Sequence, residues 1–126
     1  MKLQEIRDYC NSKAETKEDF PFDMETLVFK VVDKMFALTN IKSEELRINL
    51  KCDPTRAQLL RKEYKAIIPG FHMNKTHWNT VIIDGSLKKE FIFELIDHSY
   101  ELVVKGLPKS KRPKVQHFKN SDQKQE

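Results

Sequence analysis

One stretch of the chain gathers the side chains best suited to binding chemistry. It runs from Phe71 to Val81 as FHMNKTHWNTV, and it holds the only tryptophan, two of the four histidines and two asparagines. Lysine neutralises phosphate, and an asparagine amide can bond both edge atoms of an adenine. We therefore expect recognition in its polar half, His72–Thr76. We expect Trp78–Val81 to be scaffold, with Trp78 in the core, where an amphipathic strand places its tryptophans.

A duplex-DNA hypothesis assigns six polar side chains to one patch. Three alternate along the predicted strand 46–52 and three lie in the stretch above: Arg47, Asn49, Lys51, His72, Asn74 and Lys75. Lysine and arginine would contact phosphates there, and the asparagines would contact bases. The alternative is that Arg47 and Lys51 solvate an open sheet face and that Asn74 and Asn79 bond backbone groups in the loop. The residue types allow both interpretations.

The sequence predicts neither a metal site nor catalysis. A zinc site needs three or four ligands, and near His72 and His77 the sequence offers only Cys52, twenty residues before His72. The run Asp97-His98-Ser99 falls in a predicted helix, where consecutive side chains point about 100° apart and cannot form a relay. The three glycines are not grouped, so there is no phosphate-binding loop. We expect no catalytic residue, no metal and no cofactor.

Length and charge limit the remaining possibilities. The 126 residues suit one domain, with a body at 1–108 and a polar, basic segment at 109–126 that is predicted to be disordered. The body holds seventeen basic and seventeen acidic residues, whereas the segment 109–126 holds six and two, so the whole net charge of +4 belongs to that segment. No apolar stretch approaches the roughly 20 residues of a membrane span. Cys10 and Cys52 are expected to be buried thiols in a reducing cytoplasm.

Periodicity predicts the elements that position these residues. Helices are expected over about 2–13, from Pro54 to about 64, and from about Phe91 to Gly106. Strands are expected over 27–32 and 35–39, joined at Asp33-Lys34, and then over 46–52 and 77–83. The predicted order is a helix, three strands, a helix, two strands and a helix (α-β3-α-β2-α). The predicted fold is an α+β two-layer sandwich with a five-stranded antiparallel sheet and helices on one face.

Two further expectations concern the chain before the hairpin. The polar residues 14–19 are interpreted as a connection without regular structure. The two rings of Phe20-Pro21-Phe22 are expected to pin that connection onto the core, because proline favours an extended chain there.

Several motifs in the same order resemble the MmcQ/YjbR family. They span most of residues 3–108: Glu18–Phe22, Leu27–Val31 with Lys34–Leu38, Asn49–Pro54, Pro69–Lys75 with His77–Val81, and Leu102–Val104 with Gly106–Pro108. The resemblance implies the fold predicted above and a cytoplasmic bacterial protein of poorly defined role. It also implies binding of DNA through a "double-wing" arrangement of loops. Where the family commonly has glycines, this chain has Asp33-Lys34, which puts an acid in a loop expected to face DNA.

Two functions therefore stand at this stage. The first is a DNA-binding protein that contacts the phosphate backbone of duplex DNA through loops (wings) and a basic sheet face. The alternative is a non-enzymatic protein-interaction or adaptor module whose open sheet face takes a partner strand or peptide, or pairs with itself. We expect a monomer that does not enter a membrane, although the alternative also allows a dimer.

Overall fold

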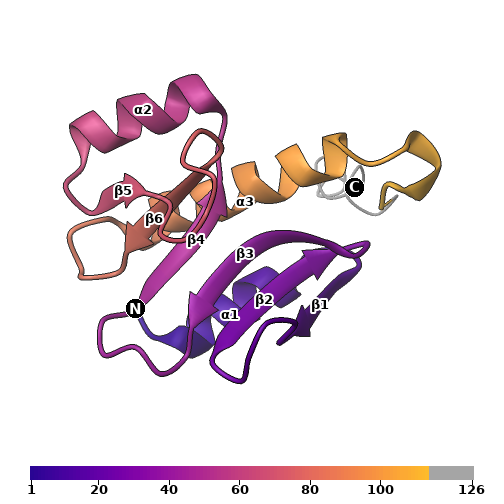
Figure 1. The fold of residues 1–126 in the computed structure, drawn as a ribbon, viewed down its shortest axis with the longest axis horizontal. Helices are drawn as coiled ribbons and strands as arrows, with labels where there is room; N and C mark the ends of the chain where they lie inside the picture. Colours follow the sequence, from indigo (N-terminus) through magenta and orange to yellow (C-terminus); the bar gives the residue numbers. More distant parts are fainter. Residues whose placement is uncertain (114–126) are drawn as a thin grey trace, which may run out of the picture.

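The computed structural model describes residues 1–113 and has an α+β fold (Figure 1). Three α-helices and one 3-10 helix accompany six strands: α1 (Leu3–Asn11), β1 (Thr16–Asp19), β2 (Thr26–Val31), β3 (Lys34–Asn40), β4 (Arg47–Lys51), α2 (Pro54–Glu63), β5 (Ile67–Pro69), β6 (Trp78–Ile82), α3 (Lys89–Lys105) and η1 (Lys109–Lys111). The strands form one sheet in the order β1-β2-β3-β4-β6-β5, and every neighbouring pair is antiparallel.

The main core lies between one face of the sheet and the three helices. Every second residue of a strand such as β4 points into this core, as the periodicity of 46–52 predicted for Ile48 and Leu50. Phe29 and Phe36 on neighbouring strands are fully buried, and Phe36 meets the ring of Tyr100 on α3 edge to face at 5.2 Å. A strand whose side chains alternate in this way buries one face and leaves the other for a different use.

The opposite face of the sheet, which we call the open face, carries a second and smaller apolar cluster. Val28, Leu38 and Trp78 are buried there, with Met35 and Met73 packed against them. The prediction that Trp78 is buried is confirmed, but its ring packs on the open face and not in the main core. Figure 1 shows the β5–β6 connection lying across β4, and Met73 belongs to that connection.

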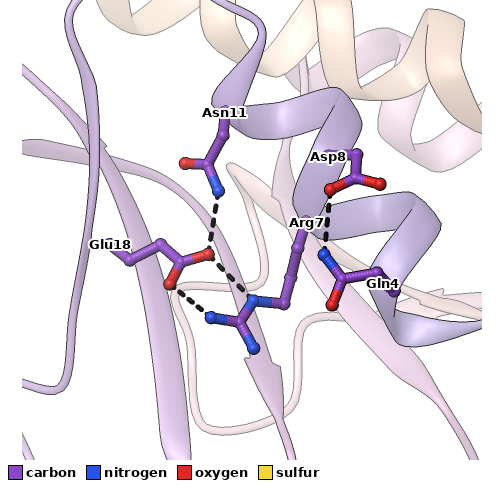
Figure 2. Close-up of polar contacts among 5 residues, drawn as sticks. All are labelled: Gln4, Arg7, Asp8, Asn11 and Glu18. Atoms are coloured by element: carbon purple, nitrogen blue, oxygen red, sulfur yellow. Dashed lines mark hydrogen bonds and ion pairs between the residues drawn. The ribbon is translucent and has the colours of Figure 1, made fainter.

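The sheet has six strands, so the predicted count of five and the predicted three strands before α2 are wrong. The additional strand is β1, in the polar stretch interpreted as a connection. Its inward-facing residues are Thr16 and Glu18. Glu18 accepts hydrogen bonds from Arg7 Nε at 2.9 Å, Arg7 Nη2 at 2.7 Å and Asn11 Nδ2 at 2.8 Å, all from α1 (Figure 2). The paired carboxylate takes the place of an apolar residue beneath the helix. A strand built in this way has no hydrophobic alternation for a sequence pattern to detect.

The predicted hairpin of β2 and β3 is confirmed, with its two-residue turn shifted by one position from the predicted Asp33-Lys34. Val31 pairs with Lys34, so the turn residues are Val32 and Asp33 and not Asp33-Lys34. Both have positive φ, 47° for Val32 and 68° for Asp33. Two consecutive positive φ angles match the twist of the flanking strands, which is how a two-residue hairpin loop closes, although this conformation is unfavourable for the β-branched Val32.

The sheet is weakly joined at β3 and β4, where only Ala37–Leu50 and Leu38–Asn49 are in register. Hydroxyl groups bridge the strands on both sides of this short ladder. Thr39 Oγ1 donates to the carbonyl oxygen of Arg47 at 2.6 Å. On the other side, buried Ser99 of α3 donates to the carbonyl oxygen of Phe36 at 2.5 Å and accepts from the amide of Lys51 at 2.9 Å.

The start of α2 is fixed by a cap that includes a histidine. Asp53 accepts a hydrogen bond from the amide of Arg56 at 3.1 Å, and Pro54 occupies the first helical turn, as the sequence predicted. The amide of Asp53 itself donates to His98 Nε2 at 3.1 Å. This bond requires a neutral imidazole. Burial and the nearby Arg56 guanidinium lower the pKa of His98, and the carboxylates of Glu94 and Asp53 only partly oppose them.

We expect the protein to lose stability as the pH falls below the ordinary histidine pKa of about 6.5. His98 has its pKa lowered in the folded state, so the unfolded chain binds the proton more readily and acid favours unfolding. Urea unfolding at pH 8 and pH 5 measures the loss, which should be about 1 kcal/mol for the bond to Asp53. His98→Gln keeps an acceptor that does not titrate and should lose less between the two pH values. An exposed control, His77→Gln, should behave as the wild type.

The described chain continues past the end of α3. Gly106 ends that helix, as predicted, and Lys109–Lys111 then form η1. Arg112 donates from Nε and Nη2 to the carbonyl oxygens of Leu107 and Lys105, so residues 109–113 of the predicted disordered segment adopt a defined turn. Residues 114–126 of that segment lie outside the described residues. No helix within 1–113 is long and apolar enough to cross a membrane.

Candidate binding groove on the open sheet face

A groove of about 570 Å³ lies on the open face. Its floor consists of β3, β4 and β6, through Leu38, Asn49 and Thr80. Its walls are three connections: the chain of 20–25 before β2, the chain of 41–46 between β3 and β4, and the chain of 70–77, which we call the 70–77 loop. A volume of this size is in the range of ligand sites in proteins.

The backbone of Phe71 is clamped to the groove floor. Its amide donates to Thr80 Oγ1 at 2.9 Å, and its carbonyl oxygen accepts from Asn49 Nδ2 at 3.3 Å. Thr80 and Asn49 also bond each other at 2.5 Å. With its backbone held in this way, Phe71 is 60% exposed and lines the groove, and its ring is tilted by 51° to the ring of His72 with 4.0 Å between the centroids.

The rest of the 70–77 loop is held by its own polar groups and by α2. Lys75 Nζ donates to the carbonyl oxygen of Gly70 at 2.8 Å, and Asn74 Oδ1 accepts from the amides of Thr76 at 2.8 Å and His77 at 3.3 Å. Arg61 of α2 donates from Nη2 to the carbonyl oxygen of Lys75. These contacts fix the conformation of the loop, in contrast to a loop that moves freely in solvent.

Arg61 reaches the loop through a buried amide. Asn79, which is buried on the helix side of β6, accepts from Arg61 Nε at 2.6 Å and donates to the carbonyl oxygen of Ala57 at 3.5 Å. Arg61 Nη2, which bonds Lys75, also donates to the carbonyl oxygen of Trp78 at 3.3 Å. The guanidinium thus connects α2, β6 and the loop, and sequence reasoning did not single it out.

On the opposite wall, Phe22 is presented by a turn that Asp23 organises. Asp23 Oδ1 accepts from the amides of Glu25 at 2.9 Å and Thr26 at 2.7 Å, and these bonds lower the pKa of the carboxyl group. The ring of Phe22 is 63% exposed and that of Phe20 is 41% exposed. The expectation that these two rings pin the chain onto the core is therefore wrong.

The structure brings three of the six predicted nucleic-acid contacts into the groove and leaves three outside it. Arg47, Asn49 and His72 line the groove. Arg47 is paired with Glu45, at 2.9 Å through Nε and 2.7 Å through Nη2, and Asn49 holds the backbone of Phe71. Lys51 is on the same face of β4, beside Trp78.

The other two residues, Asn74 and Lys75, use their polar atoms within the 70–77 loop. For Asn74 this confirms the alternative interpretation made from the sequence, in which the side chain bonds backbone groups in the loop. The same interpretation is wrong for Asn79, which bonds Arg61 and the carbonyl oxygen of Ala57, both in α2. A nucleic-acid role for the six residues stays a prediction.

The adjacent Asp97, His98 and Ser99 have three separate structural tasks, as expected for consecutive helical residues. Asp97 Oδ1 accepts from Tyr9 Oη at 2.6 Å and pairs with Lys13 Nζ at 2.5 Å. His98 bonds the start of α2, and Ser99 joins β3 to β4. Within residues 1–113, no group of three or more histidine, cysteine, aspartate or glutamate side chains could hold a metal ion.

The residues that sequence reasoning missed are the exposed apolar ones. Six large apolar side chains are exposed in the described chain, and five belong to the groove walls: Phe20, Phe22, Met24, Ile41 and Phe71. Only Leu59 on α2 lies elsewhere. They are of the same residue types as the core, so nothing in the sequence distinguished these exposed side chains from buried ones. A proline between two aromatic residues in a loop was the nearest hint.

The chain is similar to several known bacterial proteins. The family model described as YjbR matches residues 11–102. The uncharacterised protein YjbR of Escherichia coli K12 is 36% identical over 112 residues, which cover 89% of this chain and 95% of that protein. The uncharacterised protein YbdF of Escherichia coli O157:H7 is 41% identical over 100 residues, covering 76% and 79%.

Two solved structures show the same fold. A crystal structure of a Deinococcus radiodurans protein superposes with a TM-score of 0.82 at 44% identity, covering 86% of this chain and 83% of that one. A crystal structure of a Pseudomonas syringae protein superposes with a TM-score of 0.71 at 34% identity, covering 81% and 98%.

Proposed function

This chain belongs to the YjbR family, and we propose that it is a non-enzymatic protein-interaction module that binds its partner in the groove of the open sheet face. The observation that carries the proposal is the pair of exposed aromatic rings, Phe22 and Phe71, in the walls of one groove. Soluble proteins rarely gather exposed large apolar side chains in one place unless the surface meets a partner. Aromatic residues are also enriched among those that dominate binding energy.

The rigidity of the two walls supports the proposal. Asn49 and Thr80 hold the backbone of Phe71, while Asp23 closes the turn beside Phe22. A ring that is already positioned loses little conformational freedom when a partner covers it, so more of the contact energy appears as affinity. In the first wall the bonded backbone is that of Phe71 itself, and in the second wall it is that of Glu25 and Thr26, in the turn that follows Phe22.

Duplex-DNA binding remains the second candidate, and one observation favours it. Lys51 projects from the open face, and no carboxylate within residues 1–113 lies within 4.0 Å of its ammonium group. A lysine on an exposed face without a neighbouring carboxylate can contact phosphate. Arg47 and Lys75 are less available, since Arg47 is paired with Glu45 and Lys75 bonds the carbonyl oxygen of Gly70.

We expect the double substitution Phe22→Ala and Phe71→Ala to abolish enrichment of peptide ligands on the full chain. Phage-displayed random peptides are selected on the wild type, and the affinity of the enriched peptides is then measured on each variant. Each aromatic anchor should contribute at least 1 kcal/mol, so each single variant should weaken binding about fivefold to tenfold.

Leu59→Ala is the matched control, because Leu59 is 58% exposed on α2 and should leave binding unchanged. Equal enrichment on the wild type and the double variant would contradict the groove as the binding site. A labelled DNA duplex, measured alongside at low and high salt, tests the second candidate. Absence of duplex binding at low salt would rule that candidate out.

A further inference from the structure

The two groove walls formed by residues 20–25 and 41–46, counted together with the strand residues Asp19 and Arg47 beside them, concentrate negative charge. They contain five acids, Asp19, Asp23, Glu25, Glu44 and Glu45, against the two bases Lys42 and Arg47, which is a net charge of 2 − 5 = −3. The two segments are in contact, since the amide of Ile41 donates to the carbonyl oxygen of Glu25 at 2.8 Å. Because residues 1–108 are neutral as a whole, this is a local field at one end of the sheet. We call it the acidic rim.

Part of this charge is not compensated. Asp19 pairs with Lys30 at 3.1 Å, and Glu45 pairs with Arg47. In the described part of the chain, no basic nitrogen lies within 4.0 Å of the carboxylates of Asp23, Glu25 or Glu44. The rim therefore presents carboxylates beside an apolar groove, which is a surface that attracts cations and repels phosphates.

The apolar surface also extends beyond the groove itself. Met24 is 86% exposed, and Phe20 and Ile41 are exposed on the same two walls, yet none of the three lines the groove. A small molecule seated in the groove would leave these side chains in water. A polypeptide that crosses the groove would cover them together, as interfaces between proteins combine an apolar centre with a polar rim.

Resting on the proposed function, we propose that the groove receives a segment of a partner protein in which one large apolar side chain is flanked by lysine or arginine. The apolar side chain enters the space lined by Phe22 and Phe71. The flanking cations then face Glu25 and Glu44 on the acidic rim. Exposed charge pairs each contribute little, but several of them in one field increase the association rate and select among partners of similar shape.

Three labelled peptides of equal length test the proposal on the full chain by fluorescence anisotropy. The first has a central phenylalanine with lysine flanks, the second the same phenylalanine with glutamate flanks, and the third a central alanine with lysine flanks. We expect the first to bind about tenfold more tightly than either of the others at low salt. Its advantage over the second should shrink as salt is raised, because the rim is exposed.

Charge reversal of the rim provides the matched variants. The double substitution Glu25→Lys and Glu44→Lys should remove the preference for lysine flanks, whereas Glu63→Lys on α2 should retain it. Both glutamates of the rim are exposed and their side chains hold no other part of the fold together in residues 1–113. The reversal should therefore leave folding intact.

The outcomes separate this inference from the proposed function. Equal binding of both phenylalanine peptides, lost in Phe22→Ala, overturns the charge preference and leaves the groove function standing. Absence of binding by every peptide overturns both. The inference is also overturned if the alanine peptide binds as tightly as the first, or if N-acetylphenylalanine amide does. A mass of two chains in light scattering that Phe22→Ala reduces to one would place a second copy in the groove and overturn it as well.

Discussion

Replacing Ser99 with alanine should lower the free energy of unfolding by about 2–4 kcal/mol, although it removes a single oxygen atom. The hydroxyl group bridges the carbonyl oxygen of Phe36 and the amide of Lys51, where β3 and β4 share only two registered pairs. Alanine would leave a backbone donor and a backbone acceptor in the interior without partners. Each such group costs about 1–3 kcal/mol. Urea unfolding measures the change.

Two further variants test whether the loss comes from the hydroxyl group of Ser99. Ser110→Ala removes an exposed hydroxyl group in η1 and should change stability by less than about 0.5 kcal/mol. Ser99→Thr keeps the hydroxyl group and should recover part of the loss, reduced by the extra methyl group in a fully buried position. If Ser99→Ala were as stable as the wild type, the bridge would not be what joins the two halves of the sheet.

The second large effect is expected from Gly70→Ala, at the entrance to the 70–77 loop. An added Cβ would lie 2.8 Å from Trp78 Cβ, 2.9 Å from the carbonyl oxygen of Trp78 and 3.1 Å from Met73 Cβ. The amide of Gly70 also donates to that carbonyl oxygen at 2.9 Å, so the two backbones cannot separate without losing the bond. We expect a loss of about 2–3 kcal/mol, as for other overpacked sites.

Gly106→Ala is the matched control for this prediction. Its φ is −77°, and an added Cβ would approach no atom closer than 3.4 Å, so the change should be neutral or slightly stabilising. Urea unfolding compares the two variants. The fluorescence of Trp78, the only tryptophan, reports locally on the clash. A Gly70→Ala protein with wild-type stability and fluorescence would show that the loop can move away from β6 at little cost.

Gly70→Ala also links the fold to the groove. The loop that it displaces carries Phe71, whose backbone position depends on Thr80 and Asn49. Peptide affinity should therefore fall in Gly70→Ala and stay unchanged in Gly106→Ala. This glycine is required for a close approach between backbones and not for a positive φ.

Much of the fold could be predicted from the sequence, because periodic burial leaves a pattern. The alternation of Ile48 and Leu50, the cap at Asp53-Pro54 and the helix stop at Gly106 all depend on local geometry. The strand β1 could not be predicted in the same way. Its two inward positions are filled by polar residues, Thr16 and Glu18, and the carboxylate of Glu18 is paired only when α1 brings Arg7 and Asn11 to it.

The candidate site was only partly predictable for a related reason. The sequence located the 70–77 loop. It also located Arg47 and Asn49, the two residues of β4 that line the groove. It could not show that Asn49 bonds backbone or that Arg47 is paired, because those partners depend on how loops distant in sequence come together. A polar side chain has the same sequence signature whether it faces a ligand or its own loop.

The sequence by itself determined the family, the α+β class, the alternation that leaves one sheet face open, and the neutrality of residues 1–108 apart from the basic segment. The tertiary structure alone decided what the open face presents. Whether Phe22 and Phe71 are buried or exposed depends on which segments of the chain pack against them. A phenylalanine is equally hydrophobic in a core and on a surface, so its residue type does not distinguish the two. The stretch from Phe71 to Val81 thus divides at Trp78, between a loop that exposes an aromatic ring in the groove and a strand of the sheet.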